Sequence, residues 1–187
     1  MKLRNYLRTE SLVFPAMLAL AFTPPLTANE KPADVAAGAD RSMVAQGPKI
    51  AGSFEVIADR ALQAMKLRAE ELKIKGVAVV AYSPGDSIQS WSSKMIVVGH
   101  LASEPSKPDD HGANLLGIAY TKAAEMADTL KDSGSKVRPP KTGEYGWPGG
   151  VILRGKTGVL IASFSGGPSE DDVKVAKVGL AILAGAL

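Results

Sequence analysis

The segment Trp147–Leu187 constrains the fold of this chain more than any other stretch of the sequence. It contains two short apolar runs, Val151–Arg154 and Val159–Ser165, which are separated by the turn-forming residues GKTG. Short runs of this kind on either side of turn residues predict a β-hairpin. The residues SGGP end the second strand, because glycine adopts positive φ at little cost and proline has no N–H for a strand ladder.

A C-terminal helix is expected after this hairpin. It is predicted to begin at about Glu170 and to run to the end of the sequence. Ser169 and Asp172 have the spacing of a capping box at its start. The helix carries few charges beyond Lys174 and Lys177, and a helix that is apolar on nearly all sides must be buried by other parts of the protein. We expect a second subunit to contribute to that burial.

The same hairpin contains a match to the phosphate-loop pattern, in which Gly150 is followed after four residues by Gly155-Lys156-Thr157. That pattern binds phosphate only between a strand and a helix. Here the four intervening residues are VILR, and a strand is expected after Thr157. The hairpin interpretation is therefore preferred to nucleotide binding.

The N-terminus has the features of a secretory signal peptide. Basic residues precede an apolar run, Leu12–Phe22, which is followed by TPPLTA. This run is shorter than the roughly 20 residues of a membrane-spanning helix, so cleavage near Ala28 is favoured over a retained anchor. We expect residues 1–28 to direct export to the periplasm or the exterior, and residues 29–52 to form a flexible leader.

Composition limits what the exported chain can bind. Residues 1–28 contain three basic residues and one acidic residue, so their removal lowers the formal net charge from +3 to +1. No basic block remains that would indicate a nucleic-acid partner. The chain has no cysteine, which excludes a disulfide framework, thiolate metal sites and thiol catalysis. Residues 53–187 are enough for one domain with an ordinary apolar core.

The remaining elements are predicted from periodicity and turn residues. Apolar residues at helical spacing in Phe54–Leu72 predict a first helix. Val77–Tyr82 and the region Ser87–Val98 predict a first hairpin. His100–Gly112 is polar and contains two prolines, so it is expected to be a loop before a second helix at about Ala113–Asp132.

The resulting order, α-ββ-α-ββ-α, predicts an α+β domain. Consecutive hairpins favour an antiparallel sheet, and three amphipathic helices must cover it. We therefore expect two or three layers and a sheet of four to five strands.

The segments VAVVA, IAYTKAAEMA, GGVIL, TGVLIASFSGG, EDD and AKVGLAIL, in this order, resemble the GlcG/HbpS-like haem-binding family. The resemblance covers residues 58–185. It implies an antiparallel-sheet domain that assembles into homo-oligomers, with members that bind haem or related tetrapyrroles. The sequence departs from the family's pattern in the first hairpin, where VVAYSPGD lacks the usual Asp, and in an insertion at about residues 99–112.

Haem is the cofactor that this resemblance implies, and the two histidines are the candidate metal ligands. His100 and His111 bracket the loop before the second helix, and an imidazole nitrogen from either is a candidate axial ligand of haem iron. The alternative is that both are exposed loop residues. Asp109 and Asp110 either orient the imidazole of His111 or cap the second helix, and we expect the cap.

Three aromatic residues and one arginine complete the candidate binding residues. Tyr120, in the second helix, either lines a pocket or belongs to the core. Tyr145 and Trp147 lie in a loop and either stack on a flat ligand or anchor the loop to the sheet. Arg154 either pairs with carboxylates such as haem propionates or faces water.

These features predict an exported, oligomeric binding protein for haem or a related tetrapyrrole, which serves in scavenging, storage or sensing. No motif brings together a Ser-His-Asp triad or a three-histidine zinc site, so no catalytic residue is assigned. Two alternatives stay open: an enzyme or accessory factor that acts on a small oxygenated metabolite, and a purely structural assembly module. Neither a nucleic-acid partner nor a stable membrane span is expected.

Overall fold

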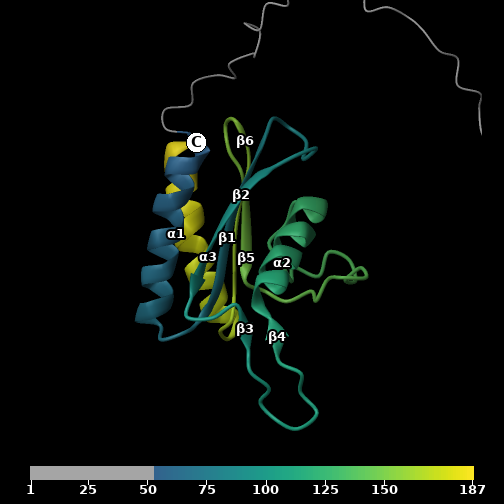
Figure 1. The fold of residues 1–187 in the computed structure, drawn as a ribbon. Coiled ribbons are helices and arrows are strands. Elements are labelled where there is room, and N and C mark those ends of the chain that lie inside the picture. The colour runs from purple at the N-terminus through teal and green to yellow at the C-terminus, as the bar shows by residue number, and fades with distance from the viewer. Residues whose placement is uncertain (1–52) are drawn as a thin grey trace, which may run out of the picture. The chain divides into compact units, whose positions relative to one another are not determined.

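Three helices and a four-stranded antiparallel sheet are formed by residues 53–187, which are the residues that the computed structural model describes. The expected signal peptide and leader lie outside them. Helix, hairpin, helix, hairpin and helix follow one another as predicted (Figure 1). The helices are α1 (Phe54–Glu71), α2 (Leu115–Thr129) and α3 (Ser169–Ala186). The sheet strands are β1 (Gly76–Pro84), β2 (Ser92–Val98), β5 (Gly150–Arg154) and β6 (Gly158–Ser165), and a separate ribbon is formed by β3 (Ala102–Ser103) and β4 (Ala113–Asn114).

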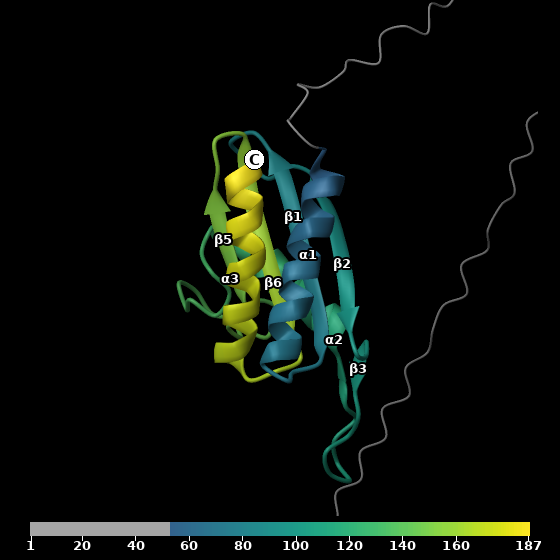
Figure 2. The ribbon, with the colours of Figure 1, turned by 90° about the vertical axis from the view of Figure 1, so that its left-hand side faces the viewer.

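The sheet has the strand order β2-β1-β6-β5, and all neighbouring strands are antiparallel. The central strands β1 and β6 are buried along almost their whole length. Because successive side chains of a strand point to opposite faces, Val80 and Phe164 pack in the core with α1 and α3, whereas Val79 and Ile161 pack on the side of α2. The helices thus cover both faces of the sheet and give three layers (Figures 1 and 2).

Helices α1 and α3 lie side by side on one face of the sheet (Figure 2). The inner face of α3, which includes Val175, Ala176 and Leu183, is fully buried by α1 and the sheet. Gly179 permits this close approach, because a Cβ at that position would overlap the side chain of Met65 in α1. No helix within residues 53–187 is both long enough and apolar enough to cross a membrane.

The second hairpin, β5–β6, confirms the prediction made for the C-terminal segment. Gly155 and Gly158 close its turn, with Gly155 N donating to Gly158 O at 2.8 Å. A strand rather than a helix follows Thr157. The match to the phosphate-loop pattern therefore has no phosphate-binding structure behind it.

The start of the second helix differs from its prediction. Ala113 and Asn114 form β4, so α2 begins two residues later than expected. Asn114 caps the helix by accepting a hydrogen bond from Gly117 N at 2.9 Å. The expected cap by Asp109 and Asp110 is wrong, because the carboxylate of Asp110 accepts hydrogen bonds from other residues of the preceding loop.

Two other element ends differ as well. Helix α2 stops at Thr129, because Leu130 adopts the left-handed conformation (φ 53°) that terminates helices. Leu130 is consequently 46% exposed. In the first hairpin, β2 begins only at Ser92, and residues 87–91 form no strand.

The capping box predicted at the start of α3 does not form. Pro168 occupies the N-cap position and Ser169 is the first helical residue. Asp172 accepts a hydrogen bond from Gly167 N at 2.9 Å instead. The second oxygen of the same carboxylate is bound to Lys122 of α2, 50 residues away in the sequence, so a tertiary contact replaces the local one.

Candidate functional site

A two-stranded arm, residues 99–114, projects from the end of the sheet at which β1 begins (Figures 1 and 2). At the base of the arm, Ala102 pairs with Asn114 and Ser103 pairs with Ala113. Ser103 Oγ also accepts a hydrogen bond from Ala113 N at 2.9 Å. The loop predicted for His100–Gly112 is thus interrupted by one short strand, Ala102–Ser103, whereas residues 104–112 form neither helix nor strand, as expected.

An open groove of about 460 Å³ lies along the base of this arm and the start of α2. Its volume is within the range of small-molecule sites, about 300–1,000 Å³. The groove is lined by Leu101, Ala102, Ser103, His111, Gly112, Ala113, Asn114 and Leu116. The lining is thus largely apolar and includes one imidazole, since Ser103 and Asn114 are already engaged in hydrogen bonds of the backbone.

The two histidines lie at opposite ends of the ribbon. His100 precedes β3 and His111 precedes β4, and the starts of two antiparallel strands lie apart. The pairing of Ala102 with Asn114 and of Ser103 with Ala113 places His100 on the sheet side of the paired residues and His111 on the side of the arm's tip. His111 lines the groove, whereas His100 is exposed outside its lining. A single iron would therefore use only one of them. Within residues 53–187, no group of three or more His, Cys, Asp or Glu side chains is arranged to hold a metal ion.

The backbone on both sides of His111 is held by Asp110. Its carboxylate accepts hydrogen bonds from Ser106 N at 2.9 Å, from Ser106 Oγ at 2.7 Å and from Gly112 N at 2.9 Å. These bonds, that of Ser106 N first, hold the pKa of Asp110 below its usual range. Gly112 has φ +73°, and a Cβ there would overlap Ser103 O. Asp110 thus fixes the path of the chain at His111.

Tyr120 lies in the layer between α2 and the sheet. It is partly buried, packs in the apolar cluster that includes Leu115 and Met95, and its hydroxyl lies 3.2 Å from Ser93 Oγ. These contacts are those of a core residue. Tyr120 is not part of the lining of the arm groove.

Tyr145 and Trp147 are brought together, but away from the groove. Their rings are 4.6 Å apart between centroids and 32° from parallel, and each side chain is about half exposed, at 50% and 49%. The loop that carries them is held by Arg138, whose guanidinium donates to both oxygens of Glu144 at 2.7 and 2.8 Å. The arrangement presents an aromatic pair to solvent on an ordered loop.

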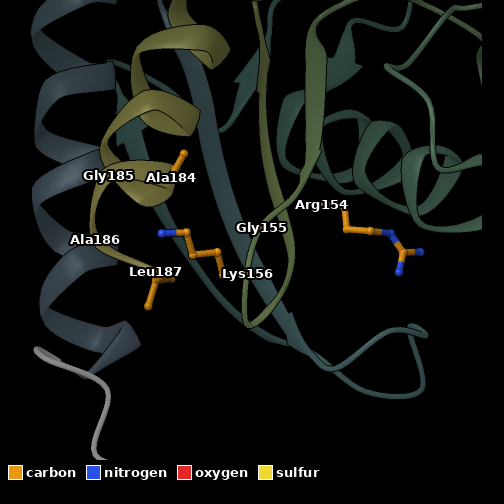
Figure 3. Close-up of a pocket in the computed structure, with 7 residues that line it drawn as sticks. All are labelled: Arg154, Gly155, Lys156, Ala184, Gly185, Ala186 and Leu187. Carbon is orange, nitrogen blue, oxygen red and sulfur yellow. The ribbon is translucent and has the colours of Figure 1, made fainter.

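Arg154 belongs to another pocket, at the far end of the sheet. This open pocket of about 480 Å³ lies between the β5–β6 turn and the end of α3. Figure 3 shows the side chain of Lys156 directed toward α3, whereas that of Arg154 points away from it. Arg154 approaches Asp86 at 3.5 Å instead. Because the two cations diverge, they do not form a convergent site for an anion.

Sequence reasoning missed a buried ion pair between α2 and α3. Lys122 Nζ donates to Asp172 Oδ2 at 2.8 Å and to Phe164 O at 2.8 Å, and both side chains are 3% exposed. Burial lowers the pKa of Lys122 and raises that of Asp172. Gly149 adjoins the pair, and a Cβ there would overlap Lys122 Nζ. The pair joins the helix on one face of the sheet to a helix on the other.

One signal for this pair was present in the sequence. Lys122 follows Ile118 by four residues, and that spacing puts the lysine on the buried face of an apolar helix. A cation at such a position requires an anionic partner.

No protein-family model and no curated protein matches this sequence. Among the solved structures that are similar to it in fold are the following two, both of low sequence identity. The crystal structure of a PduOC:haem complex shares 19% sequence identity with a TM-score of 0.48, over 70% of this chain and 94% of that chain. A double mutant of HbpS from Streptomyces reticuli shares 18% identity with a TM-score of 0.41, over 81% of this chain and 99% of that chain.

Proposed function

We propose that this chain is an exported, oligomeric binding protein for haem or a related tetrapyrrole, with His111 as its axial ligand. The observation that supports this function is the imidazole of His111 on the wall of an open, largely apolar groove of about 460 Å³. Histidine is a common proximal ligand of haem iron. Leu101 and Leu116 supply apolar surface on which a flat macrocycle would lose contact with water.

The chemistry of the groove suits binding rather than catalysis. When bound, haem would supply a redox-active iron and a strong visible absorbance, while the chain would supply one nitrogen ligand and apolar contact. Asp110 and Gly112 hold the backbone that carries His111, so little ordering of the arm is needed on binding. The groove is open to solvent, which suits the reversible loading that scavenging, storage or sensing requires. Export is inferred from the basic and apolar segments at the N-terminus.

Titration of haemin into the purified protein tests this function. We expect a Soret band that saturates with haemin, and a loss of affinity of at least about tenfold, or about 1.4 kcal/mol, in His111→Ala. His100→Ala is the matched control, because it removes an exposed imidazole from the same arm without changing the groove lining. It should bind haemin as the unchanged protein does.

The free energy of unfolding of each variant should be within about 0.5 kcal/mol of that of the unchanged protein, because both side chains are exposed. A titration without a Soret band would contradict haem binding. Equal losses in the two variants would contradict the assignment of His111. A purely structural module would show neither a Soret band nor a haemin-dependent rise in melting temperature.

A further inference from the structure

The two edges of the sheet differ in whether their backbone groups are satisfied. Along β5, Gly150 N donates to Ser133 Oγ at 2.8 Å and Ile152 N donates to Asp132 Oδ1 at 3.0 Å. Gly150 O accepts a hydrogen bond from Ser133 N at 3.2 Å. The loop that follows α2 therefore occupies the outer backbone groups at the start of β5, and it blocks the addition of another strand there.

The opposite edge, β2, is open. In an antiparallel pair, alternate residues of a strand turn their N–H and C=O groups away from the partner strand. Within residues 53–187, the N–H and C=O groups of Ser92–Val98 that face away from β1 make no hydrogen bond to another segment. Figure 2 shows β2 at the margin of the sheet, beside α1. An edge strand of seven residues with free backbone groups is a template for pairing with another strand.

Two of the usual protections of an edge strand, proline and a β-bulge, are missing from β2. Its sequence, SSKMIVV, contains no proline or glycine, and its last three residues are β-branched. Its single charge belongs to Lys94, whose Nζ lies 2.6 Å from Asp59 Oδ1 and 3.2 Å from Glu55 Oε2 of α1. Because α1 engages this ammonium, it is not directed outward, where it would repel an approaching strand.

We infer that β2 pairs antiparallel with β2 of a second copy of this chain, across a twofold axis. In such an interface the same residues meet from both sides, and the two sheets become one continuous sheet. Pairing of β2 with β5 of another copy would give an open-ended chain of molecules, but the loop residues Asp132 and Ser133 occupy β5. The contact through β2 therefore closes as a dimer. This inference rests on the oligomerisation in the proposed function and is independent of haem binding.

Single cysteines provide the test, because the chain contains none of its own. Each residue from Ser92 to Val97 is replaced in turn by cysteine, and the purified proteins are oxidised. A disulfide forms only when the two Cα atoms lie within about 7 Å of each other. We expect covalent dimers to be most abundant at one position, which marks the twofold axis. Yields should fall on both sides of it, since each step away from the axis separates the two cysteines by about 7 Å. Leu153→Cys, on the closed β5 edge, is the exposed control and should give no dimer.

Proline variants supply a second measurement that does not depend on oxidation. Met95 and Ile96 are neighbours, so one of them turns its N–H toward β1 and the other turns it outward. Proline is tolerated where a strand N–H faces outward on an edge. Of Met95→Pro and Ile96→Pro, one should therefore stay folded and sediment as a monomer, having lost only the stabilisation that the dimer supplies. The other should lose more stability, because it also breaks a hydrogen bond to β1.

Two results would overturn the inference in distinguishable ways. A monomer of the unchanged protein in sedimentation analysis would remove oligomerisation from the proposed function, and the β2 contact with it. If the protein is an oligomer but its β2 cysteines stay unlinked, only the β2 contact is contradicted. In that case another surface assembles the oligomer, or residues 1–52 occupy the edge. Neither result bears on the haemin titration.

Discussion

Lys122 and Asp172 show how a single buried pair joins the layers of this fold. Each ion loses its hydration on burial, at a cost of several kcal/mol. The mutual contact at 2.8 Å, together with hydrogen bonds to Phe164 O and from Gly167 N, offsets that cost. Removal of either partner leaves the other as an unpaired buried charge, and such losses exceed those of exposed ion pairs.

We predict that Lys122→Met lowers the free energy of unfolding by about 3–5 kcal/mol, because Asp172 then lacks its cation. Replacing both partners, as Lys122→Met with Asp172→Leu, should recover most of this loss, since no unpaired charge remains. Urea denaturation measures the change. Lys177→Met, on the exposed face of α3, is the matched control and should stay within about 0.5 kcal/mol. A loss in Lys122→Met no larger than that of the control would contradict the buried pair.

The residue types of the candidate site were predictable, but their placement was not. His111 was selected together with His100, because imidazole is a haem ligand and the chain has only two histidines. That it lines the groove while His100 does not depends on the register of β3 and β4, which only the folded arm shows. Asp172 was assigned to a capping box from local spacing, and its true partner lies 50 residues away. The local spacing indicates that Lys122 is buried, but it does not show which anion is its partner.

Among the elements, long apolar patterns were predicted well and short strands were missed. The hairpin β5–β6 and the buried stripe of α1 agree with the prediction, because each contains enough residues to show a period. Strands β3 and β4 have only two residues each, so their sequences show no alternation. Residues 135–146 form neither helix nor strand. That they are nevertheless held in place follows from ion pairs that bridge the loop, such as Arg138 with Glu144.

The stability of the loop at residues 135–146 should depend on pH. Hydrogen bonds from Arg138, and then from Lys141 N, lower the pKa of Glu144 from 4.5 to about 2. Because the folded-state pKa is the lower one, the stabilisation from ionised Glu144 is complete above about pH 4.5 and is lost as the pH falls through about 2. We expect amide exchange in residues 138–147, relative to that of the core strands, to accelerate across this range in the unchanged protein.

The matched variants are Glu144→Gln and Glu170→Gln. In Glu144→Gln the loop should exchange quickly at every pH, with no added step below pH 4.5, because the ionised partner of Arg138 is absent. Glu170 is exposed at the start of α3, so Glu170→Gln should behave as the unchanged protein. A step centred near pH 4.5 in the unchanged protein would show that Arg138 does not hold the carboxylate of Glu144.

At the scale of the whole molecule, the order of elements determines the layers but not the edges. Two consecutive hairpins and three amphipathic helices lead to a covered antiparallel sheet, and the structure confirms this α+β architecture. Which edge stays open depends on the contacts of Asp132 and Ser133 with β5, about 20 residues further along the chain. A pattern-based prediction therefore finds the domain but cannot show where a second copy would attach.

If two copies unfold together, thermal stability must depend on protein concentration. For a dimer that dissociates as it unfolds, a tenfold increase in concentration adds about 1.4 kcal/mol per dimer, which raises the melting temperature of a domain of this size by about 2 °C. Differential scanning calorimetry across a hundredfold range should show this rise in the unchanged protein. Whichever of Met95→Pro and Ile96→Pro sediments as a folded monomer should melt at one temperature throughout, because its unfolding no longer includes dissociation. A melting temperature of the unchanged protein that is equally insensitive to concentration would mean that the β2 edge contributes nothing to its stability.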